Sequence, residues 1–142
     1  MKHEFVVEGD PVGKGRPRFT KTGRAYTPKR TKEYEARVRQ AYIDSCGPYF
    51  GDEEVSIIIE AYFEMPKSWP KKKRRALEGK YCTKKPDTDN LIKGVLDALL
   101  GAAYEDDKQV VVCIGMKRWA EEGYMHVDIL GAHDGSEVVI NG

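Results

Sequence analysis

The sequence predicts an α+β domain in which helices pack on one face of a mixed β-sheet. Its apolar residues alternate in some segments and recur at helical spacing in others, which gives the element order β-α-β-α-β-β. The 142 residues, 40% of them hydrophobic, are enough to build one core without metals or disulfides. Because the sequence contains neither repeats nor a linker, residues 1–142 are expected to form a single domain.

The first half of the chain contributes a strand, a basic loop and a helix. The segment 3–9 alternates around apolar residues and is predicted to be a strand. Residues 10–30 combine glycine and proline with seven Lys/Arg, so we expect an ordered basic loop without regular elements. Thr31 is suited to cap a helix over 32–46, which Gly47 ends.

The middle of the chain adds a strand and two helical segments. The β-branched run 54–66 is predicted to be a strand, and the basic segment 70–80 a short helix or turn. The clearest helix is predicted over 88–100, where apolar residues fall at helical spacing before Gly101.

Two more strands are predicted near the C-terminus, over 108–119 and 123–132. Because only the short segment "AEEG" separates them, we expect an antiparallel hairpin. The tail 133–142 carries no clear pattern and is expected to fray.

Charge is unevenly distributed along the chain. The net charge is only +1, but residues 11–39 hold ten Lys/Arg against two Glu, and residues 67–85 hold nine against one. Residues 86–142 hold four Lys/Arg against eleven Asp/Glu. Two cationic blocks beside an acidic half suit a polyanion partner and a cation-binding site. Charge alone fits solvated loops equally well.

Several classes of protein are disfavoured. No apolar run is long enough to span a membrane, and the N-terminus does not resemble a signal peptide. The three cysteines are scattered and form neither a CxxC motif nor a disulfide framework, so a reducing cytoplasm is expected. The segment "GKGRPR" lacks the Walker pattern, and the three histidines are expected to be structural or exposed.

Two aspartates open the clearest helix, in the segment "KPDTDNLIKGVLDAL". Capping needs one of them, and residues two apart on a helix do not face each other. Asp87 and Asp89 can therefore converge only if Asp87 lies in the turn before the helix. Lys93 follows Asp89 by one turn on the same face. Asp97, about 12 Å from Asp89, is too distant to share an ion and is assigned to solvent or a structural bond.

A second acidic cluster, "YEDDKQ" over 104–109, precedes the next strand. The helix carries the chain roughly 17 Å from Asp89, and the following residues can return about 23 Å, so Asp107 can reach the first pair. Converging carboxylates repel one another unless a cation binds, and hard oxygen ligands favour Mg²⁺ or Mn²⁺. One capping aspartate and a solvated acidic turn is the alternative, and spacing leaves both open.

The segment "KPDTDNLIKGVLDALLGAAYEDDKQVV" resembles the core signature of the RusA-type Holliday junction resolvases, a family of endodeoxyribonucleases. In that family a D-x-D-N-x-x-K segment is followed by a helix and then by a D-D-x-Q-V turn into a strand. The N-terminal "GKGRPRFTKTGRAYTPKRTKEYE" is similar to the family's basic opening. Together these segments cover about half of the chain in the family's order.

The resemblance implies a Mg²⁺-dependent homodimer that nicks four-way DNA junctions symmetrically in recombination and repair. The oxygen ligands would also accept Mn²⁺ as a substitute ion. Carried over position by position, Asp87, Asp89 and Asp107 would be the catalytic carboxylates and metal ligands. Lys93 would be the essential basic residue.

Cations of the basic loop are the predicted contacts to DNA phosphates, which arginine can bind bidentately. They are Lys14, Arg16, Arg18, Lys21, Arg24, Lys29 and Arg30. Phe19, Tyr26 and Trp69 lie among cations and could stack on bases, although packing is expected for any one of them. Asn90 and Asp106 match the family motif without an assigned role.

Two alternatives to a junction resolvase are left open. One is a non-catalytic junction-binding protein whose acidic cluster serves structure. The other is a flap or general branched-DNA nuclease. For the implied homodimer, the apolar strands 54–64 and 108–115 are candidates to supply part of the interface.

Overall fold

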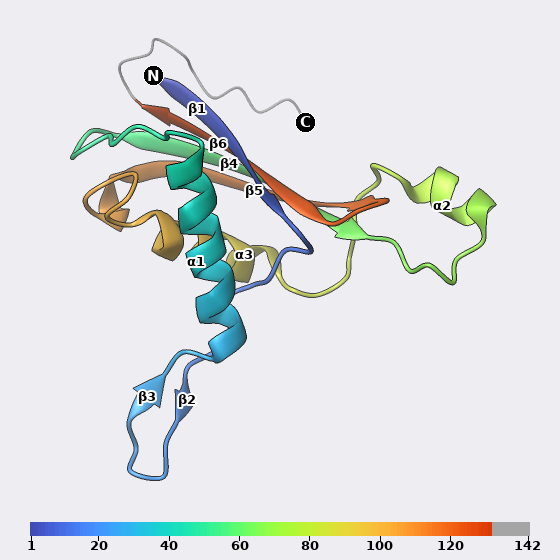
Figure 1. Cartoon of the computed structure of the whole chain (residues 1–142), viewed down its shortest axis with the longest axis horizontal. Coiled ribbons are helices and arrows are strands. Elements are labelled where there is room, and N and C mark those ends of the chain that lie inside the picture. Colours follow the sequence, from blue (N-terminus) through green and yellow to red (C-terminus); the bar gives the residue numbers. More distant parts are fainter. Residues whose placement is uncertain (132–142) are drawn as a thin grey trace.

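The structure, a computed structural model, describes residues 1–131, and the predicted tail 133–142 lies outside these residues. The described residues form an α+β fold with a four-stranded sheet and a separate small hairpin (Figure 1). The elements are β1 Lys2–Glu8, β2 Arg18–Phe19, β3 Ala25–Tyr26, α1 Lys29–Asp44, β4 Val55–Glu64, α2 Lys71–Leu77, α3 Thr88–Leu99, the 3-10 turn η1 Asp107–Gln109, β5 Val110–Ala120 and β6 Tyr124–Gly131. No helix among them has the length and apolar character needed to cross a membrane.

The four-stranded sheet has the order β1-β6-β4-β5 and is mixed, as predicted. β6 lies antiparallel to both β1 and β4, whereas β5 lies parallel to β4. Alternate residues of β4 from Val55 to Phe63 are apolar and buried, and their neighbours are half-buried. This alternation lets β4 supply the middle of the core from one face.

The predicted hairpin between the last two strands is wrong. β5 and β6 run in opposite directions, but β4 lies between them and pairs with both. The connection after Ala120 passes the end of β4, where the Met65 N–H donates to the Ala120 carbonyl at 3.0 Å. Strands two positions apart are separated by about 9.6 Å, a distance that a few extended residues can span. A short connection therefore does not identify neighbours in this sheet.

The helices α1 and α3 pack on one face of the sheet, as predicted (Figure 1). α1 buries Tyr34, Val38 and Tyr42 in the shared core. α3 lies close to β5 at Gly115, where a Cβ atom would be 2.7 Å from Thr88 Cγ2. This close approach places the start of α3 against the middle of β5. α2 buries no residue and extends away from the sheet (Figure 1).

The basic loop and the start of α1 differ from the prediction. α1 begins at Lys29 after Pro28, so Thr31 is not its cap. Thr31 instead lies buried in the first turn, where its Oγ1 accepts a hydrogen bond from Gly15 N at 3.0 Å. The predicted loop 10–30 is not free of regular structure, because it contains the hairpin formed by β2 and β3.

Candidate functional site

The start of α3 leaves two carboxylates free. Asp87 is the N-cap residue, with an extended backbone (φ −67°, ψ 151°), yet its side chain makes no capping hydrogen bond. Asp89 lies in the first turn, and both residues are exposed. Among residues 1–131 neither carboxylate forms a hydrogen bond or ion pair. Asp87 thus lies in the turn before the helix, the position that convergence with Asp89 requires.

Asp107 lies near Lys93, whose charge acts on it. It opens the turn η1, and both residues are exposed. Partial loss of hydration raises the pKa of Asp107, and the charges of Asp97 and Asp106 raise it further. The ammonium of Lys93 acts in the opposite direction and lowers this pKa. Lys93 is therefore close enough to stabilise the charge on Asp107.

The three predicted carboxylates are not gathered at one coordination distance. In the described part of the chain, the one set of three ligand-type side chains with atoms within 4.8 Å of one another lies elsewhere. Asp107 is close enough to Lys93 and Asp97 for their charges to act on its pKa. Asp87, Asp89 and Asp107 are therefore not assembled in advance around one ion, and a shared ion requires these side chains to close on it.

The acidic turn that carries Asp107 is held by Gln109, a residue to which sequence reasoning gave no role. Gln109 is buried, and its Nε2 donates to the carbonyls of Gly51 at 2.8 Å and Glu53 at 2.7 Å. Its Oε1 accepts from Asp106 N at 2.8 Å, and the Asp106 carboxylate caps the turn, which completes a capping box. The D-x-x-Q spacing of Asp106 and Gln109 is the sequence signal from which this capping box could have been predicted.

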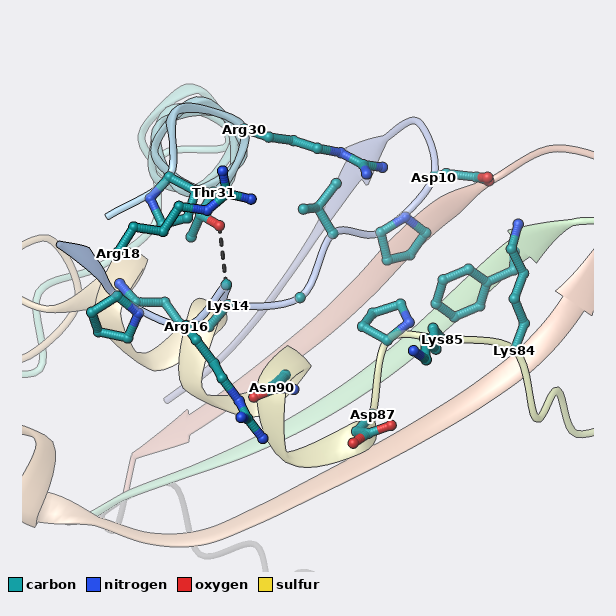
Figure 2. A pocket seen from close by; sticks show the side chains of 18 residues that line it. Asp10, Lys14, Arg16, Arg18, Arg30, Thr31, Lys84, Lys85, Asp87 and Asn90 are labelled. Atoms are coloured by element: carbon teal, nitrogen blue, oxygen red, sulfur yellow. Dashed lines mark hydrogen bonds between the residues drawn. The ribbon is translucent and has the colours of Figure 1, made fainter. Parts of the chain in front are cut away.

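A groove lined by cations leads to Asp87 (Figure 2). Its walls come from the segment before β2, the first turn of α1 and the residues before α3. We call it the cationic groove, after the side chains Arg16, Arg18, Arg30, Lys84 and Lys85. Gly13 lets the backbone of the groove pass close to the start of α3, because a Cβ atom there would lie 2.5 Å from Pro86 Cβ and 3.2 Å from Asn90 Cβ. Asn90 lines the same end of the groove as Asp87.

Lys14, one of the predicted DNA contacts, is occupied within the fold. Its Nζ lies 2.6 Å from Glu35 Oε1 and 3.1 Å from Asp97 Oδ2, so it joins α1 to α3. Its backbone N–H also donates to the Asn90 carbonyl at 2.9 Å. We therefore assign Lys14 to the structure of the site rather than to DNA. Asp97 makes the structural bond that was one of its two predicted roles.

The ion pairs of Lys14 predict a loss of stability on its replacement. Lys14→Met should lower the free energy of unfolding by about 1–3 kcal/mol, because two partly buried carboxylates lose their cation. Urea unfolding measures this change. The matched variant Lys21→Met, on the exposed hairpin turn, should stay within about 0.5 kcal/mol. Equal midpoints for the two variants would contradict the structural role.

The other loop cations are accessible. Lys21 and Arg24 are exposed on the turn of the hairpin, and Arg16, Arg18 and Arg30 line the cationic groove. Lys29 is exposed too, and its pair with Glu33 at 3.7 Å is a surface pair of little strength. Six of the seven predicted cations can thus meet a polyanion. The exception is Lys14.

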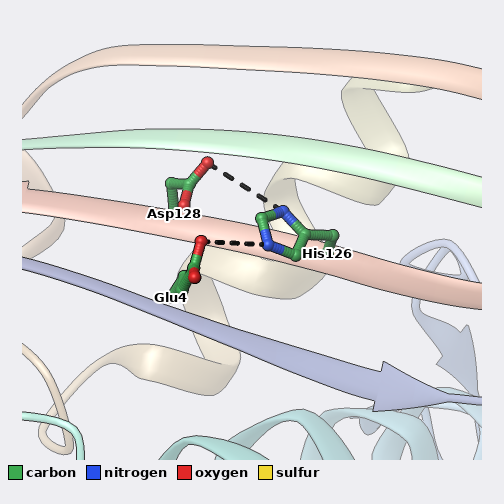
Figure 3. A group of neighbouring side chains, drawn as sticks. All are labelled: Glu4, His126 and Asp128. Carbon is green, nitrogen blue, oxygen red and sulfur yellow. Dashed lines mark ion pairs between the residues drawn. The ribbon is translucent and has the colours of Figure 1, made fainter.

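Among residues 1–131, the set of three ligand-type side chains with atoms within 4.8 Å of one another lies on the sheet face that turns away from the helices (Figure 3). His126 Nε2 is 3.4 Å from Glu4, and its Nδ1 is 3.9 Å from Glu60 and from Asp128. Burial raises the pKa of Asp128, and the charge of His126 lowers it. The set shares no residue with the acidic signature, so it has no place in the candidate site.

The chain is similar to known proteins over most of its length. Residues 8–130 match the model of the family described as endodeoxyribonuclease RusA. The chain is also 36% identical over 133 residues to the uncharacterized protein YqaN of Bacillus subtilis (strain 168), an alignment that covers 89% of this chain and 94% of that protein. The family match includes α3, the acidic turn and the cationic groove. The chain therefore belongs to the RusA family of metal-dependent endodeoxyribonucleases, which implies branched DNA as its substrate.

Proposed function

We propose that this protein is a Mg²⁺-dependent, structure-specific endodeoxyribonuclease that resolves four-way DNA junctions by paired symmetric nicks. The observation that carries the proposal is the pair of free carboxylates at the start of α3, Asp87 and Asp89, of which Asp87 lines the cationic groove. The helix uses neither side chain as a cap, so structure alone does not account for them. A phosphate backbone held in the groove would pass directly beside Asp87.

The residues of the site fit a hard divalent cation. All three carboxylates reach solvent, and the raised pKa of Asp107 reflects lost hydration and like-charge repulsion that a cation would relieve. Asp87, Asp89 and Asp107 would hold Mg²⁺, for which Mn²⁺ can substitute. When bound, the ion supplies an activated water as nucleophile and stabilises the charge that develops on the phosphate.

The chain's own cations complete the reaction site. Arg16 and Arg30, which both line the groove, bind and orient the phosphate backbone. Lys93, one turn beyond Asp89, places a positive charge where negative charge grows on the phosphate oxygens during cleavage. Gln109 holds the backbone of the acidic turn to the carbonyls of Gly51 and Glu53, which leaves the Asp107 side chain to close on the ion.

A nicking assay tests the proposed function. The substrates are a four-way junction, a flap, and a linear duplex with the same arm sequences, each with Mg²⁺ and with EDTA. We expect paired nicks at symmetric positions in the junction, with Mg²⁺ only. Faster cutting of the flap would identify a general branched-DNA nuclease. Junction binding without cutting in either Mg²⁺ or Mn²⁺ would identify a non-catalytic binding protein.

Salt dependence tests the phosphate contacts. Association with several phosphates releases counterions, so log affinity should fall against log salt with a slope of about −0.9 for each phosphate neutralised. The triple variant with Arg16, Arg18 and Arg24 replaced by glutamine should flatten this slope by up to about 3 and weaken binding to all junction sequences alike. A slope that does not change would place the DNA surface elsewhere.

Paired nicks require two active sites, so we propose a two-fold homodimer, the commonest symmetry of oligomers. The strands predicted for the interface correspond to β4 and the first half of β5. Both contribute to the sheet face opposite α1 and α3, and β5 also carries the exposed Val111. Light scattering should give twice the mass of the chain, with and without junction DNA. A monomer in both conditions that still makes paired nicks would contradict the dimer.

The cysteines agree with a cytoplasmic location, which we also propose. Cys46, Cys82 and Cys113 are all free thiols, and none of them is paired. Free thiols persist in a reducing compartment, where DNA recombination and repair would take place.

A further inference from the structure

The hairpin of β2 and β3 forms an arm that extends beyond the body of the protein. Figure 1 shows it at the end of α1, away from the sheet. Every residue from 16 to 26 is exposed, and we call this segment the arm. It carries four cations and no acidic residue: Arg16, Arg18, Lys21 and Arg24. Its surface is thus suited to contact a polyanion outside the chain.

Local hydrogen bonds shape the end of the arm. Thr20 N donates to the Arg24 carbonyl at 2.9 Å, and Arg24 N donates to Thr20 Oγ1 at 3.1 Å. Gly23 N donates to the Thr20 carbonyl at 2.9 Å, with the positive φ of +83° that favours glycine. The turn therefore has a defined shape before any partner binds.

Phe19 presents an uncovered ring on this arm. It is 70% exposed, whereas the other phenylalanines are buried: Phe5, Phe50 and Phe63. Its cross-strand partner is Ala25, which is too small to cover the ring. Tyr81 has a similar exposure, but the Arg118 guanidinium lies 4.5 Å from its ring centre. Within residues 1–131, Phe19 has no such ring partner, so its predicted packing role is not observed.

Trp69, by contrast, does pack. Its ring meets that of Trp119 edge to face, with centroids 5.1 Å apart, and Lys73 Nζ lies 4.1 Å from its centre. Of the two aromatic residues on the arm, Tyr26 is 44% exposed and lies opposite Arg18. Phe19 is therefore the most accessible stacking surface among the aromatic residues near the loop cations.

The position of Phe19 relates its ring to the cationic groove. It directly follows Arg18, which lines the groove that ends at Asp87. DNA that extends from the groove along the arm would bring a nucleotide to the ring. In linear duplex DNA the bases are stacked on both sides, and their exposure costs free energy. At a branch point the stack is interrupted, so a base there can accept the ring at lower cost.

We propose that Phe19 stacks on a base at the branch point of the DNA junction and thereby contributes to selection of branched over linear DNA. This deepens the proposed function and rests on it. The arm cations hold the flanking phosphates, while the ring contacts the interrupted base stack. Stacking requires only a π face, so the contact selects DNA structure without selecting sequence.

Equilibrium binding without divalent ions tests the role of Phe19 separately from cleavage. Phe19→Ala should weaken junction binding by about five- to a hundredfold, the range for loss of one stacked base, and leave linear duplex binding unchanged. Phe19→Trp should retain junction binding. The matched variant Tyr49→Ala removes an aromatic ring that is 58% exposed outside the arm, and it should have no effect.

Fluorescence gives a second readout. With 2-aminopurine at the branch point, the wild-type protein should change the emission of the probe, and Phe19→Ala should lose this change. Equal weakening of junction and duplex binding, or no weakening of either, would overturn the stacking role. Light scattering of the Phe19→Ala variant gives a further check. If its mass differed from that of the wild-type protein, the ring would contact a second copy of the chain, and the stacking role would be overturned.

These outcomes separate the inference from the proposed function. Wild-type protein that nicks junctions, together with a Phe19→Ala variant of unchanged junction selectivity, refutes the stacking role alone. Wild-type protein that neither binds nor nicks junctions refutes the proposed function.

Discussion

Replacement of any one of Asp87, Asp89 or Asp107 by asparagine should lower the rate of junction nicking by at least about a hundredfold. Asparagine keeps the size of the side chain but removes the charge that binds the cation. Junction binding should persist, and it could tighten because a negative charge that faces phosphate is lost. Single-turnover nicking and equilibrium binding of the same junction measure the two effects.

The matched control for these variants is Glu105→Gln, which makes the same change of charge in the acidic turn. Glu105 is exposed, and only its backbone N–H is held, by Gln109 Oε1 and the Gly51 carbonyl. Its replacement should leave nicking unchanged. Near-normal nicking by an aspartate variant would remove that residue from the site.

Lys93→Ala should lower the nicking rate by about 10²–10³-fold, with little loss of junction affinity. The ammonium contributes most where charge develops on the phosphate, and much less to the ground-state complex. Lys93→Arg, which keeps the charge, should recover part of the rate. Lys108→Ala removes an exposed cation next to Asp107 and should have a small effect.

A pH series separates two ways in which Lys93 could act. Because Lys93 lowers the pKa of Asp107, its removal raises that pKa and favours the protonated carboxyl. If Lys93 acted only through Asp107, nicking by Lys93→Ala would recover as the pH is raised. A loss that persists at high pH indicates direct stabilisation of the phosphate charge. If Lys93→Ala mainly lowered the affinity for the junction, both explanations would be contradicted.

Most elements of the fold could be predicted because their apolar periodicity is local. β4 and α3 lie within two residues of their predicted bounds, since alternation and helical spacing end where the elements end. The pairing of β5 and β6 could not be predicted in this way. Which strand inserts between two others depends on the whole core, and β4 takes that position through its row of buried residues.

The candidate site could be predicted in residue identity better than in geometry. Chain length allowed Asp107 to converge with Asp87 and Asp89, but the three carboxylates do not lie within coordination distance of one another, because the reach of a segment does not fix how it packs. Lys14 shows a second limit. Composition does not distinguish a cation that faces solvent from one paired with Glu35 and Asp97.

The last described strand, β6, is inserted between the first strand, β1, and β4. Lys2 pairs with Leu130, so residues from opposite ends of the sequence are neighbours in the sheet. During synthesis, β1 has no partner until β6 leaves the ribosome, and one edge of β4 stays open for the same interval. Such widely separated contacts slow folding. The nascent chain is thus exposed to association through its strand edges until β6 has been synthesised.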